Sequence, residues 1–257
     1  VNKKGEKIYT AIVYTGFHSE IMNRGFAINS VYPGFVTMRV TPKEIFELIK
    51  INSVIYVDAP IKMDLHNDVS TSMSGASLLH NGYVMSSVFK GSGVVVAIID
   101  TGIDWTHLDF RDPADNTKSR ILYIWNQTLT ALSGEYPPSG FDYGVEYTKA
   151  QIDDELDGTP PNFVREKDTH GHGTHVAGTV CGNGNSLTTK RFTGFAPETD
   201  IIIIKTTFSN ADITDAYNYL NQKKTTLGKP VVVNASLGSN YGPHDGTDVM
   251  STAINSF

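Results

Sequence analysis

The sequence predicts an α/β protein with a doubly wound, mostly parallel sheet, preceded by a small α+β domain. Strands buried on both faces of a parallel sheet form continuous apolar runs rather than alternating ones. Three such runs lie within residues 91–100, 199–207 and 229–237. The segments 172–182 and 213–228, which lie between them, read as helices. Strands that alternate with helices are typical of doubly wound folds.

The first 65 residues predict the small α+β domain. Strand-forming composition or alternation marks three segments, which are 7–16, 34–40 and 53–61. A helix is expected over residues 41–51. Thr41 can cap its N-terminus, Pro42 suits its first position, and Glu44 stands where it completes a capping box.

A polar segment separates this region from the rest of the chain. Residues 65–75 are rich in Ser and Thr, which favours a linker. The sequence therefore predicts two domains, 1–65 and 66–257. Within the second, residues 112–166 form a long polar and aromatic stretch. A connection of this length is expected to be functional or to contain small elements of its own.

The composition restricts the class of protein. The chain has 257 residues, of which 40% are apolar and 19% charged, as in a globular protein. A net charge of −6 without a Lys/Arg cluster argues against nucleic acid or a membrane as partner. The single cysteine, Cys181, excludes an internal disulfide and a cysteine-based zinc site. No apolar run is long enough to span a bilayer.

Two segments indicate hydrolytic chemistry. VVVAIIDTGID (94–104) is an apolar strand that ends at Asp100, so this carboxylate is expected at the carboxyl edge of the sheet, where ligand sites form. DTHGHGTHVAG (168–178) places His172 between two glycines at a helix start. An aspartate that holds an imidazole through Nδ1–H stabilises the imidazolium formed in proton transfer. A single Asp at a strand end most often only caps a turn. The prediction of hydrolytic chemistry therefore depends on Asp100 and His172 together.

The histidine segment leaves a metal site open as an alternative. His170, His172 and His175 lie within six residues and could ligate zinc. Their spacing fits no standard zinc pattern, and no Glu follows as in H-E-x-x-H. Proton transfer by His172 is therefore favoured. His170 is expected to line the same cleft, and His175 to point elsewhere.

Taken in order, DTGID, HGTHVAGT and NASLG resemble motifs of the subtilisin-like serine proteases, the subtilases. The resemblance covers nearly the whole chain. It implies a subtilisin-like catalytic domain over 66–257 that hydrolyses polypeptides with a triad in the order Asp, His, Ser. It also implies that Asp100 is the catalytic aspartate and His172 the general base, and that the chemistry needs no cofactor.

The same resemblance implies a substrate-binding segment and a calcium site. Ser236, Leu237 and Gly238 match the segment that pairs with the substrate backbone as an added strand and borders the S1 pocket. Asp109 matches a position that ligates structural calcium in many members. Asn185 is a second candidate, since calcium prefers such oxygen ligands.

Residues 1–65 resemble the N-terminal propeptide of the family, which acts as an intramolecular chaperone and inhibitor. The chain's own propeptide is therefore an expected partner beside polypeptide substrates. Cleavage of the propeptide is expected within 58–75. A propeptide of this length usually accompanies export, which implies a secreted or extracytoplasmic location, although no signal peptide is visible.

The nucleophilic serine and the oxyanion asparagine of the family are not found in the sequence. It contains no GTSxA or G-x-S-x-G pattern, and Ser74 precedes Asp100, which is the wrong order. One explanation is a piece of a longer serine endopeptidase, inactive alone because it lacks both groups. The alternative is a non-catalytic pseudoprotease or peptide-binding regulatory module. The intact motifs of Asp100 and His172 favour the first.

Overall fold

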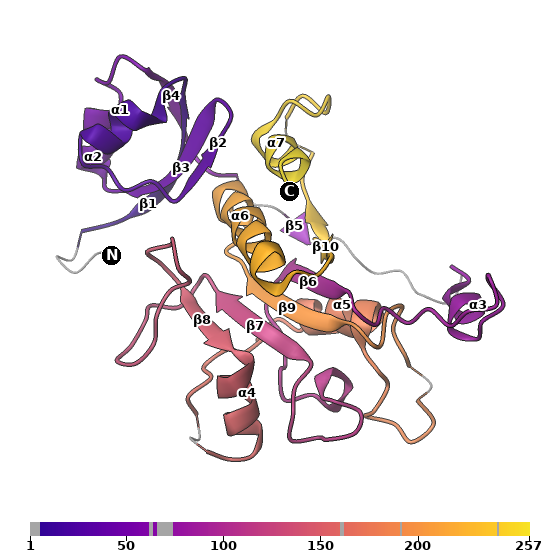
Figure 1. Ribbon diagram of the computed structural model, residues 1–257. Coiled ribbons are helices and arrows are strands. Elements are labelled where there is room, and N and C mark those ends of the chain that lie inside the picture. The colour runs from indigo at the N-terminus through magenta and orange to yellow at the C-terminus, as the bar shows by residue number, and fades with distance from the viewer. Residues whose placement is uncertain (1–5, 62–63, 66–73, 160–161, 191, 241) are drawn as a thin grey trace.

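Two sheets dominate the computed structural model (Figure 1). The structure describes residues 6–61, 64–65, 74–159, 162–190, 192–240 and 242–257. A four-stranded sheet is formed near the N-terminus, and a five-stranded sheet by the rest of the chain. Most of the predicted linker, 65–75, lies outside the described residues, and the domain boundary there stays a prediction.

The N-terminal unit is a small antiparallel sheet with two helices. Its elements are β1 (Tyr9–Thr15), α1 (His18–Asn23), β2 (Ser30–Tyr32), β3 (Phe35–Val40), α2 (Pro42–Leu48) and β4 (Val54–Asp58). The strand order is β2-β3-β1-β4, and all neighbours are antiparallel. Helix α2 begins with the predicted capping box. The Thr41 hydroxyl accepts from the N–H of Glu44, and the Glu44 carboxylate accepts from the N–H of Thr41.

The larger sheet has the predicted mostly parallel, doubly wound character. Its strands are β6 (Val95–Asp100), β7 (Ile121–Asn126), β8 (Val145–Thr148), β9 (Asp200–Lys205) and β10 (Val231–Asn234). The order is β10-β6-β9-β7-β8, with β8 as the antiparallel edge strand. The three apolar runs form β6, β9 and β10. The long stretch 112–166 supplies β7, β8 and the helix α4 (Lys149–Leu156).

Helices cover both faces of this sheet, as a doubly wound fold requires. On one face, Val176 of α5 (His172–Cys181) belongs to the same apolar cluster as Ile98 of β6. On the other face, Leu220 of α6 (Asn210–Leu227) belongs to a second cluster with Ala97 of β6. Adjacent β6 residues thus point into opposite cores, which explains why the run has no polar position before Asp100. Helix α6 ends at the predicted cap Gly228, whose φ is +60°.

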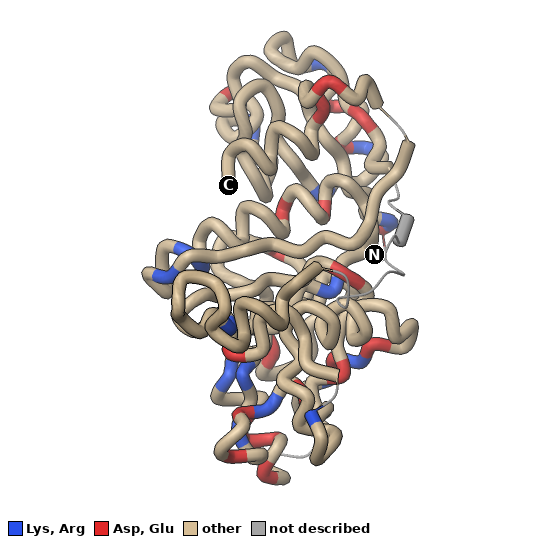
Figure 2. Tube along the Cα trace, turned by 90° about the vertical axis from the view of Figure 1, so that its right-hand side faces the viewer, with Lys and Arg blue, Asp and Glu red and all other residues tan. Residues whose placement is uncertain are grey.

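Shorter elements complete the described chain. They are β5 (Asp64–Leu65), α3 (Ala76–His80), the 3-10 helix η2 (Leu108–Phe110), β11 (Leu237–Gly238) and α7 (Val249–Asn255). Among the described residues, no helix combines the length and apolar character needed to cross a bilayer. Acidic and basic positions are interspersed along the trace in Figure 2.

A buried carboxylate joins the N-terminal sheet to α6. Asp215 of α6 is 0% exposed. Its Oδ1 accepts hydrogen bonds from the hydroxyls of Ser30 and Thr37 in the N-terminal sheet. Its Oδ2 accepts from Tyr143 OH at 2.9 Å. Burial raises the pKa of Asp215 to about 6, although the hydrogen bonds from Ser30 and Thr37 favour its charged form.

An ion pair and an apolar contact reinforce this interface. The Arg39 guanidinium of β3 lies 2.7 Å from the carboxylate of Asp212 on α6 and 3.5 Å above the ring of Tyr143. Phe35 of the sheet packs in one cluster with Ala211 of α6. The first domain is therefore fixed on α6 by directional polar contacts as well as by apolar burial.

We expect the docking of the N-terminal sheet to weaken as the pH rises from about 4 to about 6. An aspartate with an ordinary pKa of 3.8 binds its proton less tightly than docked Asp215, whose pKa is about 6. Protonation therefore favours the docked state. Across this window the wild-type chain should lose about 2 kcal/mol of stability relative to Asp215→Asn, whose amide does not titrate.

Thermal unfolding of both chains between pH 4 and pH 7 measures this difference. Subtracting the curve of the variant removes the contributions of other titrating groups. Asp245→Asn, a change at an exposed position, serves as the control and should follow the wild type. Identical pH profiles for the wild type and Asp215→Asn would contradict the expectation.

Candidate functional site

The structure brings Asp100 and His172 together. Asp100 is the last residue of β6, and its side chain is 1% exposed. Its Oδ1 lies 2.7 Å from Nδ1 of His172 and also accepts the N–H of Thr101 at 2.7 Å. The carboxylate can only accept here, so this nitrogen carries the proton and Nε2 is the free acceptor. Oδ2 of Asp100 is buried and accepts no hydrogen bond from the described residues.

His172 is placed by the start of α5. It is the first residue of that helix, and Gly171 before it has a φ of +85°, which favours glycine. The turn from Gly171 into α5 lets the imidazole face back to the end of β6 while remaining 14% exposed. Nδ1 is thus hydrogen-bonded to Asp100, and the ring is still accessible to a reacting group, as general base catalysis requires.

Asp168 organises the approach to His172. Its Oδ1 accepts hydrogen bonds from Thr101 Oγ1 at 2.9 Å and from the N–H of Gly171 at 2.9 Å. Its Oδ2 accepts from the N–H of Thr174 at 2.8 Å and from its hydroxyl at 2.7 Å. Burial opposes the charge of Asp168, but these hydrogen bonds outweigh it and lower its pKa. Asp168 stands within the motif DTHGHGTH, yet the sequence assigned it no role.

The turn after Asp100 packs closely against α5. A Cβ added at Gly173 would lie 2.2 Å from the main-chain oxygen of Gly102 and 3.2 Å from Cβ of Asp100. The N–H of Gly173 donates to Thr101 Oγ1 at 2.8 Å. The short distance between Asp100 and His172 therefore depends on a glycine that follows the histidine.

The other two histidines of the segment lie outside this pair. The His170 ring is exposed, and its centroid is 6.2 Å from that of His172. His175 is also exposed, on the first turn of α5. The described residues contain no group of three or more His, Cys, Asp or Glu side chains placed to hold a metal ion. The zinc alternative therefore gains no support.

The predicted substrate segment reaches the same edge of the sheet. Strand β10 pairs with β6 in parallel, and Asn234 is level with Ile98. Ser236 follows β10 and donates to Asn234 Oδ1 at 3.0 Å. Leu237 and Gly238 form β11, which pairs with β5 (Asp64–Leu65) in antiparallel register. The segment already accepts an extended strand from the N-terminal part of the chain.

The two predicted calcium ligands lie on neighbouring segments. Oδ1 of Asp109, in η2, accepts the N–H of Ser186 at 2.7 Å, and Ser186 directly follows Asn185. The guanidinium of Arg120, which is 8% exposed, donates to the main-chain oxygens of Asp109 and Cys181. The two segments therefore meet here, and the buried Arg120 guanidinium already binds main-chain oxygens beside Asp109.

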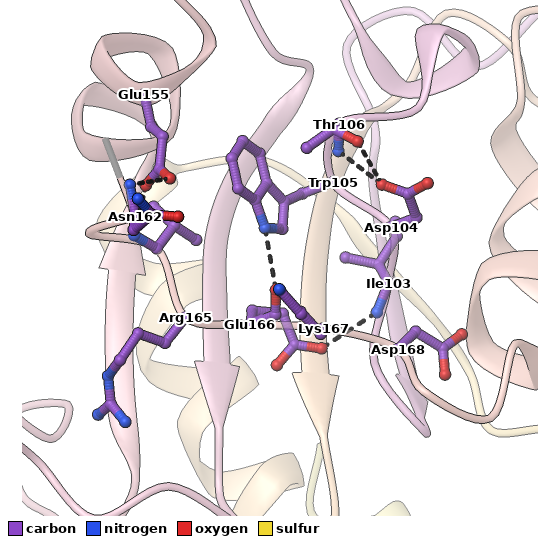
Figure 3. A pocket seen from close by; sticks show the side chains of 11 residues that line it. Ile103, Asp104, Trp105, Thr106, Glu155, Asn162, Arg165, Glu166, Lys167 and Asp168 are labelled. Atoms are coloured by element: carbon purple, nitrogen blue, oxygen red, sulfur yellow. Dashed lines mark hydrogen bonds between the residues drawn. The ribbon is translucent and has the colours of Figure 1, made fainter. Parts of the chain in front are cut away.

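A cavity of about 740 Å³ lies along the segments 103–106 and 162–168 (Figure 3). Trp105 lines it and donates its indole N–H to the main-chain oxygen of Glu166 at 3.1 Å. The Glu166 carboxylate accepts the N–H of Ile103, as the dashed line in Figure 3 shows. No role was predicted for this glutamate, because nothing in the sequence around it distinguishes it.

The mostly parallel, doubly wound sheet with helices on both faces is of the subtilisin-like class of α/β folds. Residues 91–257 match the Subtilase family. The chain belongs to this family.

Relatives support this membership. The chain is 35% identical over 161 residues to the PII-type proteinase of Lacticaseibacillus paracasei, covering 60% of this chain and 8% of the relative. It is 26% identical over 211 residues to a subtilisin of Bacillus sp. (strain TA39), covering 75% and 41%. The solved Clostridium perfringens CspB protease aligns with a TM-score of 0.57 at 31% identity, covering 70% and 37%. The chain thus spans less than half of each relative.

We expect Gly173→Ala to loosen the Asp100–His172 pair. The added methyl group would overlap the oxygen of Gly102, so the turn or the helix must move. The unfolding free energy should fall by about 1–3 kcal/mol, as for other overpacked sites. Gly178→Ala in the same helix meets no atom within 4 Å and is the matched control. Thermal unfolding of both variants measures the difference, and equal melting temperatures would contradict the expectation.

Proposed function

We propose that this chain carries the Asp–His part of a serine endopeptidase that hydrolyses polypeptides. The 2.7 Å contact between Asp100 and His172 is the observation that carries the proposal. Asp100 holds the ring by Nδ1–H. Nε2 of His172 takes the proton of a serine hydroxyl as its oxygen attacks the scissile carbonyl, then donates it to the leaving amine. Subtilase membership and its protease relatives give further support.

We propose that residues 236–238 bind the substrate backbone as an added strand. Main-chain hydrogen bonds would give affinity for an extended polypeptide, and flanking pockets a preference for particular side chains. The pairing of β11 with β5 supports this, because an extended strand already lies antiparallel on this edge. The exposed His170 beside His172 would line the same cleft.

We propose that the N-terminal domain is an intramolecular inhibitor. Strand β5 pairs with β11, the proposed substrate strand, and so would compete with substrate. The domain before β5 is held on α6 by the contacts of Asp215 and Arg39. An extracytoplasmic location is proposed on the resemblance of this domain to exported propeptides.

A peptide-binding module without catalytic activity is the second candidate. It is supported by the pairing of β11 with β5, in which the edge binds an extended strand and no catalytic group takes part. Without a nucleophile no acyl-enzyme forms, and the β11 edge would still bind extended peptide. We propose accordingly that the 257-residue chain alone does not hydrolyse peptide bonds.

Intact mass and peptide mapping of the native gene product separate the two candidates. A product with a GTSMA-like serine supports the endopeptidase. In that case His172→Ala should lower kcat by about 10⁶-fold and Asp100→Asn by about 10⁴-fold, the scale known for subtilisin and serine proteases. His175→Ala, on the same helix turn but outside the pair, should retain activity. A native product that ends at Phe257, or full activity of His172→Ala, would refute the endopeptidase.

A structural calcium ion at Asp109 and Asn185 is a separate proposal. The approach of the two segments through Ser186 supports it, and the buried Arg120 beside them opposes it. Bound calcium would raise the melting temperature of the wild type but not that of Asp109→Asn. The same melting temperature in calcium and in chelator would refute the site.

A further inference from the structure

A buried glutamate lies under the turn that follows Asp100. The Glu166 side chain is 0% exposed, in the loop between α4 and α5. Its Oε1 accepts the N–H of Ile103 at 3.2 Å. Its Oε2 accepts the side-chain amide of Asn126, at the end of β7. One carboxylate thus connects the Asp100 turn to a second strand end of the sheet.

Contacts on both sides fix the position of this turn. A Cβ added at Gly102 would lie 2.1 Å from Oε1 of Glu166, and the φ of Gly102 is +117°. The main-chain oxygen of the same glycine lies against Gly173 of α5. The turn therefore contacts both the carboxylate of Glu166 and the helix that begins with His172. A shorter or displaced side chain at position 166 would remove the first of these contacts.

Glu166 also lies near a positive charge at the end of the strand beside β6. Lys205 ends β9 level with Asp100, and its Nζ lies 3.9 Å from Oε1 of Glu166. This ammonium also donates to the main-chain oxygen of Lys167. Burial raises the pKa of Glu166 to about 7, although Lys205 and the bonds from Ile103 and Asn126 favour its charged form. The group therefore changes charge in the neutral range.

We propose that Glu166 is a positioning residue, which holds the turn 101–103 against α5 and thereby sets the hydrogen bond between Asp100 and His172. This inference rests on the proposed role of that pair in proton transfer. The hydrogen bonds of Glu166 are made with Ile103 and Asn126, and not with His172. Glu166 acts through the hydrogen bond from the Ile103 N–H and through its close packing against Gly102.

The test measures the proton that His172 shares with Asp100. In the ¹⁵N-histidine-labelled 257-residue chain, the hydrogen-bonded Nδ1–H should give a far-downfield proton resonance that exchanges slowly with water. In Glu166→Gln one oxygen remains for Ile103, but the new amide faces the amide of Asn126, so two donors oppose each other. We expect solvent exchange of the His172 proton to be about tenfold faster, the effect of losing roughly one buried hydrogen bond.

Glu155→Gln is the matched control. Glu155 lines the same cavity and accepts the main-chain N–H groups of Asn162 and Val164, but it does not contact the Asp100 turn. A general loss of stability would affect both variants. Positioning predicts that only the change at Glu166 accelerates exchange at His172, even where both variants lower the melting temperature.

A second variant covers the case in which Glu166→Gln does not fold. Glu166→Asp keeps the charge but is one methylene shorter, so it cannot hold both Ile103 and Asn126, and it should also accelerate exchange. Exchange within twofold of wild type in whichever variant folds overturns the positioning role. Equal acceleration in Glu155→Gln overturns it too. If the wild-type chain has no such resonance, the Asp100–His172 pair itself fails, and with it the proposed function.

Discussion

The hydrogen bond between Asp100 and His172 is the constraint on which the rest of the site depends. It joins the end of a central strand to the start of a helix on one face of the sheet. Two such elements approach this closely only where no side chain separates them, and here Gly102 meets Gly173. Nearby polar groups, above all the Asp168 carboxylate, then accept hydrogen bonds from main-chain N–H groups at the start of the helix.

Three carboxylates, Asp168, Glu166 and Asp215, fall into two kinds by their surroundings. Asp168 accepts several hydrogen bonds, which lower its pKa despite burial. Glu166 and Asp215 are more deeply buried, and burial raises the pKa of each. The first kind is a fixed negative charge that supports local structure. The second kind lies between separate parts of the fold, so its ionisation is coupled to how those parts fit together.

Much of the fold could be predicted because its signals are local. The apolar runs gave β6, β9 and β10, and Thr41 with Glu44 gave the start of α2. Asp100 and His172 stood in long motifs. The roles of Glu166 and Asp215 could not be predicted, since their partners lie far away in sequence. Asp215, for example, is bound by Ser30, 185 positions earlier.

The pairing of β5 with β11 has a consequence for how the strand edge can be occupied. Both strands belong to one covalent chain, so their association is unimolecular, and dilution of the protein does not separate them. A competing peptide must displace a strand whose effective local concentration is of order millimolar for short connections. This is harder than displacing a ligand that is free to diffuse away. Cutting the chain between residues 65 and 74 would turn the same contact into an ordinary bimolecular equilibrium.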